Sequence, residues 1–401
     1  MDDHRKGRVL AISSLILSLF EFGAHGAPPV EDNNAFAFDL YAQLKDQPGN
    51  LFFSPYSIST CLAMAYAGAR GETEKQMAQV LHFDSDQKRL HSGFAALQKQ
   101  LAEAEKVKGI ELNIANGLWA QKGHPFLTDY LNVARDEYKA QIEQADFMKN
   151  AESIRQEINH WVERKTKEKI KDIVPAGALN DMTRLVLANA IYFKGAWRQP
   201  FPKSMTEPQP FHLSPERQVE VPLMHHFDVV RYFEDDNMQG VEMPYLGNQL
   251  SMAVLLPRKV DGCAELESRL SAGSLAGWLG QMKSHKVEIF FPRFKLESEI
   301  SLSRVLGKMG MRNAFTPTAD FSGMDGRREL FISAVLHKAW GDINEEGTEA
   351  AAATVAVATA SAALPAPPPP VFRADHPFVF LIRDSRSGGI LFLGRFSNPS
   401  P

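Results

Sequence analysis

Cysteine is scarce in this chain. Only two of its 401 residues are cysteines, Cys61 in an apolar helical pattern and Cys263 in a polar turn. A pair so placed does not provide the disulfide framework that holds small secreted proteins together. The fold must therefore rest on its apolar core, and a chain of this length with 44% hydrophobic residues can build a large one.

An excess of charge of either sign is also missing. The chain has 44 basic and 48 acidic residues, which gives a formal net charge of −4. A balance this even supplies no field for binding phosphates, so we expect no nucleic-acid partner.

Common catalytic and cofactor motifs are absent as well. The sequence has no nucleophile elbow, no phosphate-binding P-loop, no H-E-x-x-H and no G-x-G-x-x-G after a strand. His225 and His226 are adjacent, so they cannot face one metal ion from a helix or a flat strand. We predict a protein that is not an enzyme and that has neither a cofactor nor a metal.

Long apolar runs are absent beyond the first thirty residues, and the run found there is short. It extends from Val9 to Phe20, follows a basic stretch and precedes several small residues. This order is typical of a signal peptide, here residues 1–27, with cleavage near Gly26 or Ala27. The run is too short to span a membrane, so the sequence predicts a protein secreted to the extracellular space or periplasm, without membrane association. The alternative is a disordered N-terminal tail.

The order of helical and strand patterns predicts the fold class. Helical periodicity dominates the first third, in 33–44, 57–69, 73–81 and 87–104, and occurs again in 154–169. Short apolar strands follow, in 185–193, 249–256, 287–294, 378–382 and 390–396. Helices first and strands later favour an α+β domain with mainly antiparallel sheets.

One late segment fits neither pattern. From Ala350 to Phe372 no residue is charged, most are Ala, Val, Thr or Ser, and a proline run, Pro367–Pro370, lies near the end. The composition allows an Ala-rich helix, a linker or an exposed loop that can form a strand. Because strand-like segments follow it, we interpret the segment as an internal loop.

Several segments, in order along nearly the whole chain, resemble motifs of the serpin family of serine protease inhibitors. They are 50–59, 68–73, 187–197, 291–294, 336–338, 372–382, 392–396 and 398–399. The resemblance implies a single domain, residues 28–401, with about nine helices, three β-sheets and a reactive loop at about 345–370. It also implies a monomer that inhibits by suicide: a serine protease cleaves the loop, becomes covalently trapped, and is carried along as the loop inserts into the main sheet.

The start of the loop is similar to the hinge of inhibitory serpins. The matching residues are Glu345, Gly347, Thr348, Ala350, Ala351, Ala352 and Ala353. In a strand, alternate residues face one side, and the inward set that begins at Thr348 and Ala350 is small and uncharged. Such a strand can enter a sheet without burying a charge. Two alternatives stay open: the alanines only make the loop flexible, or the protein is a non-inhibitory serpin with a carrier, chaperone or storage role.

Other matching positions have roles implied by the resemblance alone. Positions that hold the main sheet closed are matched by Ser54, Ser57, Asn189 and His337. Each is alternatively an ordinary capping or satisfied core residue. Trp197 and Arg293 match the place where the loop first enters the sheet, and Arg293 is expected to pair with Glu345.

The residues around the scissile bond indicate the class of target. Counting from Glu345 as is usual for serpins puts that bond at Ser361–Ala362, with neighbouring bonds between 360 and 364 left open. Counting back from Pro377 instead favours a point nearer Ala366. No Arg or Lys lies between Glu349 and Arg373, which argues against trypsin-like targets. Small residues instead suit an elastase-like or subtilisin-like protease, whose pocket discriminates by side-chain size.

Overall fold

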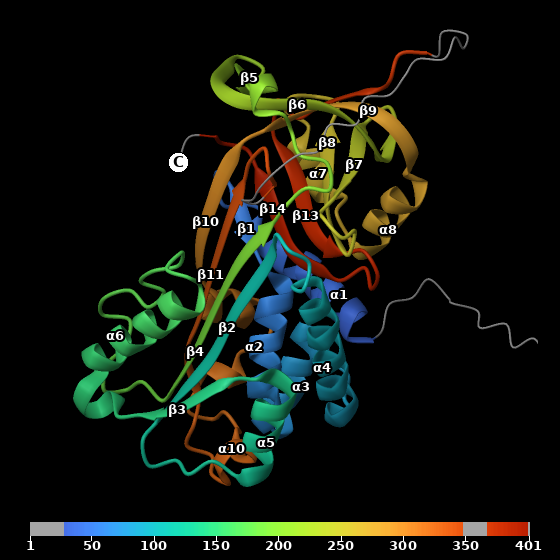
Figure 1. Ribbon diagram of the computed structural model, residues 1–401. Helices are drawn as coiled ribbons and strands as arrows, with labels where there is room; N and C mark the ends of the chain where they lie inside the picture. Colours follow the sequence, from blue (N-terminus) through green and yellow to red (C-terminus); the bar gives the residue numbers. More distant parts are fainter. Residues whose placement is uncertain (1–27, 348–366, 400–401) are drawn as a thin grey trace, which may run out of the picture.

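The computed structural model describes residues 28–347 and 367–399. Within these ranges it contains ten α-helices, most of them in the first half of the chain (Figure 1). They are α1 (Pro28–Leu44), α2 (Pro55–Gly68), α3 (Gly71–Leu81), α4 (Gln87–Ala104), α5 (Thr128–Tyr138), α6 (Phe147–Lys165), α7 (Cys263–Ser268), α8 (Ala272–Gln281), α9 (Leu302–Met309) and α10 (Ser322–Asp325).

The main sheet has five strands in the order β10-β11-β4-β2-β3. Their bounds are β2 (Ile110–Gln121), β3 (Gln141–Ala145), β4 (Leu185–Gly195), β10 (Phe294–Ser301) and β11 (Ile332–Ile343). Strands β4 and β11 are parallel neighbours at its centre. Strand β10 runs antiparallel to β11 and β2 antiparallel to β4, while β2 and β3 form a second parallel pair at the edge. The central parallel pair matters for function because an antiparallel strand would fit between β4 and β11 with regular pairing on both sides.

The second sheet has nine strands, in the order β1-β14-β13-β8-β7-β6-β9-β12, with β5 paired to β6. Their bounds are β1 (Leu51–Phe53), β5 (Glu207–Ser214), β6 (Arg217–Glu234), β7 (Met238–Pro244), β8 (Leu250–Pro257), β9 (Lys283–Pro292), β12 (Val371–Arg373), β13 (Phe378–Asp384) and β14 (Ile390–Phe396). The predicted α+β class is confirmed. Two of the three expected sheets are continuous in the described residues, because the long strand β6 belongs to both.

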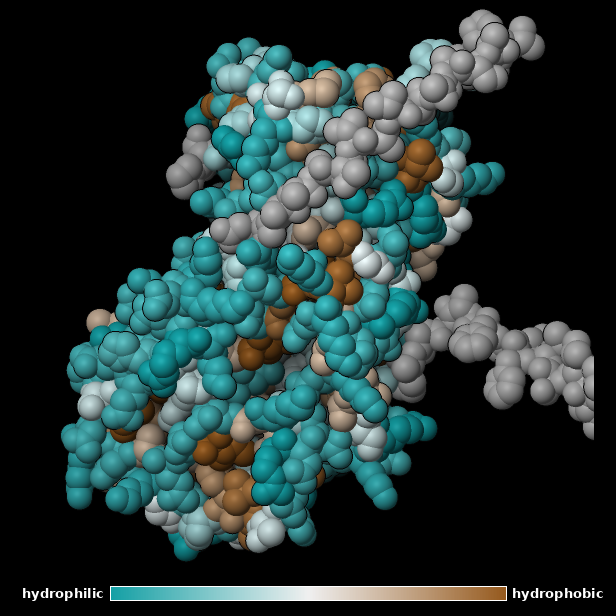
Figure 2. All heavy atoms as spheres, in the orientation of Figure 1, coloured by the Kyte–Doolittle hydropathy of each residue, from teal (hydrophilic) through white to brown (hydrophobic). Residues whose placement is uncertain are grey.

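Helices cover both faces of the main sheet (Figure 1). Helix α6 packs on one face, where Ile158 and Trp161 contact alternate residues of the central strands, among them Ala188. Helix α2 lies on the other face and is buried along its whole length. The face drawn in Figure 2 is largely hydrophilic, with hydrophobic residues visible in a strip near its middle and in patches in its lower part. No helix of the described residues is long and apolar enough to cross a bilayer.

Local chemistry explains several element boundaries. Helix α4 begins where the Asp86 side chain accepts the Arg89 N–H, and the predicted range 87–104 is confirmed. The predicted range 154–169 is wrong at both ends: α6 begins at Phe147 and ends before Lys167 and Glu168, whose φ angles are positive. A positive φ is incompatible with a right-handed helix, and helical periodicity in the sequence does not reveal it.

A break between two strands was also missed. The predicted strand 287–294 is divided at Arg293, which lies between the end of β9 and the start of β10. Both cysteines are buried and not disulfide-bonded. His225 and His226 point to opposite faces of β6: His225 stacks on Phe290, and His226 packs in the interior against Phe201.

Candidate functional site

The centre of the site is the seam between β4 and β11. The two strands are paired from Leu185 opposite Ile332 to Phe193 opposite Gly341. An inserting strand must break this pairing and can then pair with both neighbours. The structure is therefore that of a closed main sheet.

The four predicted sheet-closing residues lie together at the middle of this seam. Asn189 of β4 donates from Nδ2 to the Ser57 carbonyl (3.0 Å) and to Ser57 Oγ (2.6 Å). On β11, His337 contacts Asn189 through Nδ1, and its Nε2 accepts the backbone N–H of Ser54 (3.1 Å). All four side chains are fully buried. The cluster joins both strands of the seam to the start of α2, and its role in holding the sheet closed stays a prediction.

The protonation state of His337 follows from these contacts. Because Nε2 accepts a hydrogen bond, the proton lies on Nδ1 and is donated to the Asn189 carbonyl oxygen. Burial lowers the pKa of His337 from 6.5 to about 3, since a charged imidazolium would lose its hydration there. The residue is thus neutral at physiological pH, and a second proton would face a donor instead of an acceptor.

Sequence reasoning missed a fifth member of the cluster, Asn116 of β2. Its Oδ1 also accepts a hydrogen bond from Asn189 Nδ2, and the residue is buried. Asn116 extends the network to a third strand of the main sheet. The strand also contains Glu111 and Asn113, so the sequence offered no signal that singled out Asn116.

The predicted hinge begins at the upper end of the seam. Gly347 forms isolated β-bridges with Ala196 and Asn344, and its φ of 113° lies where side chains are strained. A Cβ on Gly347 would lie 2.2 Å from the Gly195 carbonyl oxygen. Glycine is therefore required both by the backbone angle and by the close approach of the chain ending β4.

The two residues predicted to lie where the loop enters do lie beside the hinge. Trp197 is buried, stacks on Tyr245, and donates from Nε1 to the Asn344 carbonyl (3.0 Å). Arg293 forms the expected ion pair with Glu345, with 3.4 Å between Nη1 and Oε1. The Glu345 side chain is 6% exposed, so Arg293 is the countercharge of a mostly buried carboxylate.

The sequence did not predict that the segment after α6, here called the strap, would lie over the seam. The segment after α6 crosses the main sheet, and Lys338 of β11 donates from Nζ to the Lys171 carbonyl (2.8 Å). Lys338 also pairs with Glu297 and Glu299 of β10, and Lys169 lies over the Trp340 ring. A strand that enters the seam must pass beneath this segment and displace these contacts.

The remaining predicted positions lie outside the described residues. They are the hinge residues Thr348, Ala350, Ala351, Ala352 and Ala353 and the proposed reactive bond Ser361–Ala362. In the part of the chain that the structure describes, no three His, Cys, Asp or Glu side chains come together as metal ligands.

Comparison with known proteins identifies the family. The model of the serpin (serine protease inhibitor) family matches residues 31–399. Leukocyte elastase inhibitor of Xenopus tropicalis is 40% identical over 373 residues, covering 91% of this chain and 97% of its own. An uncharacterized serpin-like protein of Thermococcus kodakarensis is 42% identical over 372 residues, covering 93% and 86%.

Comparison with solved structures indicates the same family. The crystal structure of uncleaved ovalbumin matches with a TM-score of 0.84 at 30% identity, over 94% of this chain and 100% of ovalbumin. This chain belongs to the serpin family. The family is one of protease inhibitors, and this member is not an enzyme.

Proposed function

We propose that this serpin is a suicide inhibitor of an elastase-like or subtilisin-like serine endopeptidase. The observation that carries the proposal is the closed seam of parallel strands β4 and β11, with a hinge glycine directly above it. Behind the hinge follows a segment whose inward-facing residues are small and uncharged. Cleavage of the loop frees this segment to enter the seam and carry the acylated protease with it.

The energy for trapping comes from the new strand. About a dozen new backbone hydrogen bonds at ~1 kcal/mol each release on the order of 10 kcal/mol. This is comparable with the whole stability of a domain, so the closed form is metastable relative to the inserted one. The closing cluster around Asn189 and the strap on Lys338 oppose insertion, and both must yield as the strand enters.

Two facts support the target class. Leukocyte elastase inhibitor is 40% identical to this chain over almost its whole length. The loop sequence around Ser361–Ala362 contains only small, uncharged residues, which fit a shallow specificity pocket better than one built for Arg or Lys.

The decisive experiment is incubation with pancreatic elastase, neutrophil elastase and subtilisin, followed by a denaturing gel and intact-mass analysis. We expect a covalent complex that survives denaturation, with a released C-terminal peptide whose mass locates the bond. Clean cleavage without complex by every protease would overturn the inhibitory proposal and leave a non-inhibitory serpin.

A matched pair of variants tests insertion itself. Thr348→Arg places a charge on the inward face of the inserting strand, whereas Ala351→Arg places the same charge on the outward face. We expect the first to be cleaved as a substrate and the second to keep forming complex. Equal behaviour of the two variants would contradict insertion as a strand in this register.

We also propose that the protein is exported. Residues 1–27 have the basic, apolar and small-residue order of a signal peptide, and the family match begins only at residue 31. Expression of the full chain with a C-terminal tag, followed by N-terminal sequencing, tests this. A mature start near residue 27 or 28 supports export, and an intact N-terminus in the cell fraction contradicts it.

A further inference from the structure

A hollow lined by arginines lies on the second sheet, away from the seam. Its walls come from β6, β7, β8, β9, β13 and neighbouring loops, and its volume is about 270 Å³. Three guanidinium groups, from Arg198, Arg231 and Arg383, and three serine hydroxyls line it. Among the described residues that line it, only Glu242 is acidic.

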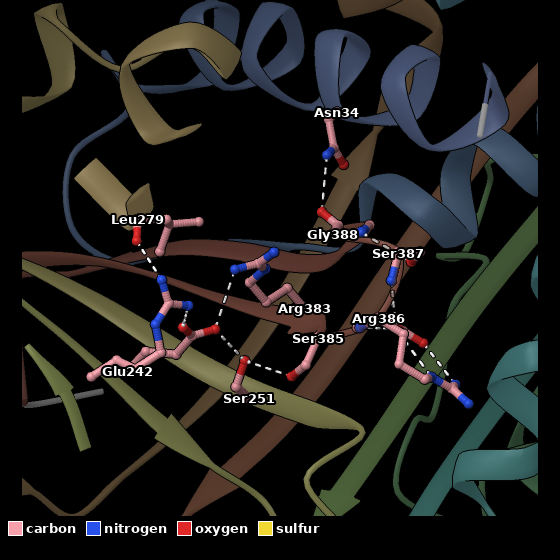
Figure 3. Close-up of polar contacts among 12 residues, drawn as sticks. Asn34, Glu242, Ser251, Leu279, Arg383, Ser385, Arg386, Ser387 and Gly388 are labelled. Carbon is pink, nitrogen blue, oxygen red and sulfur yellow. Dashed lines mark hydrogen bonds and ion pairs between the residues drawn. The ribbon is translucent and has the colours of Figure 1, made fainter. Parts of the chain in front are cut away.

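Glu242 neutralises only part of this positive charge. Its carboxylate is 7% exposed and pairs with both Arg231 and Arg383, so two guanidinium groups share one negative charge. Ser251 donates to Glu242 Oε1 (2.7 Å), and Ser385 donates to Ser251 Oγ. Figure 3 shows these side chains facing one another from neighbouring strands. The polar wall therefore keeps an uncompensated positive charge.

Arg383 is the most informative of these residues. Its side chain is 15% exposed, yet Glu242 Oε1, at 3.2 Å from Nη1, is its one hydrogen-bond acceptor within the described ranges. A guanidinium carries five N–H donors, and Glu242 engages only Nη1 of Arg383. Arg231, in contrast, also donates to the Leu279 carbonyl, and Arg198 pairs with Asp228. Arg383 thus keeps N–H donors that Glu242 does not engage and that a ligand in the hollow can use.

We propose that this hollow binds a small tetrahedral oxyanion, a phosphate or sulfate group. Guanidinium groups bind such oxygens through paired, charge-assisted hydrogen bonds, and hydroxyls on the same wall can donate to the remaining oxygens. The apolar part of the wall, Val229, Val230 and Pro244, leaves room for a short organic substituent. The hollow does not include the paired residues of β4 and β11, and the proposal does not depend on the proposed inhibitory function.

Equilibrium dialysis with labelled inorganic phosphate at fixed ionic strength tests the proposal. The intact protein is expected to take up one phosphate per chain saturably, with displacement by sulfate and not by acetate. Arg383→Met keeps the aliphatic stem and is expected to weaken binding about tenfold or more, because charge-assisted bonds are lost. Arg258→Met is the matched control, since Arg258 forms an ion pair with Glu234 outside the hollow.

A second variant tests the proposal even if Arg383→Met fails to fold. Ser284 is an exposed residue of β9 that lines the hollow, so Ser284→Leu fills space without removing an ion pair. It is expected to block phosphate uptake while circular dichroism and thermal unfolding stay unchanged. Absence of saturable uptake by the intact protein, or equal uptake by all variants, overturns the proposal. Displacement by acetate as effective as by sulfate overturns the tetrahedral assignment.

Discussion

Mild acid is expected to loosen the closed sheet through a single residue, His337. In the native protein its Nε2 accepts the Ser54 N–H and its Nδ1 contacts Asn189, so both nitrogens are engaged while the ring is neutral. A second proton on Nε2 would remove the first of these bonds and place a charge in the fully buried middle of the seam. Protonation therefore opposes the closed form.

The sign and size of the change in unfolding free energy follow from the pKa of His337, which burial lowers from 6.5 to about 3. Between these values the unfolded chain binds one more proton than the native protein, so the free energy of unfolding falls as the pH falls. The contribution is fully present above about pH 6.5 and is lost progressively down to about pH 3. pH 4.5 lies about two units below the ordinary pKa of 6.5, so at that pH the free energy of unfolding has fallen by about 3 kcal/mol.

The assay compares urea unfolding of the native protein and of His337→Gln at pH 7.5 and pH 4.5. Glutamine can accept from Ser54 and donate to Asn189 without titrating, so the variant should lose about 3 kcal/mol less on acidification. The comparison is necessary because burial also lowers the pKa of His91 and of His226 to about 4. The same pH dependence in both proteins would refute the reasoning.

Three further substitutions probe the seam and the hinge. Asn189→Ala removes the donor and acceptor that join three strands to α2, and we expect a loss of about 3 kcal/mol in urea unfolding. Gly347→Ala is expected to dislodge the hinge, since its Cβ would meet the Gly195 carbonyl oxygen at 2.2 Å, and to speed spontaneous loop insertion on native gels. Glu345→Lys places a second cation beside Arg293 and should promote polymers or early insertion.

Each substitution has a specific control or contrary result. Gly273→Ala adds a Cβ with no atom within 4 Å and should leave the insertion rate unchanged. The double variant Glu345→Lys with Arg293→Glu restores opposite charges and should return the protein to monomer. Normal stability of Asn189→Ala would show that the closing cluster contributes little to the seam.

The sequence by itself determined the fold class, the family and four of the residues that meet at the seam. Helical and strand periodicity are local properties, and they placed elements such as 87–104 and 390–396 at their observed bounds. The motifs named Ser54, Ser57, Asn189 and His337 because serpin sequences keep the same residue types in the same order. The composition of the loop also showed that the residues predicted to face inward carry no charge.

Only the tertiary structure decided which atoms meet. Three contacts join residues far apart in the chain. They are the hydrogen bond between Asn189 and Asn116, the bond from Lys338 to the Lys171 carbonyl, and the ion pair of Arg383 with Glu242. Burial likewise sets the pKa of His337, and burial depends on what α2 and the neighbouring strands place around the ring. Such contacts depend on how strands and helices pack, which the periodicity of one segment does not specify.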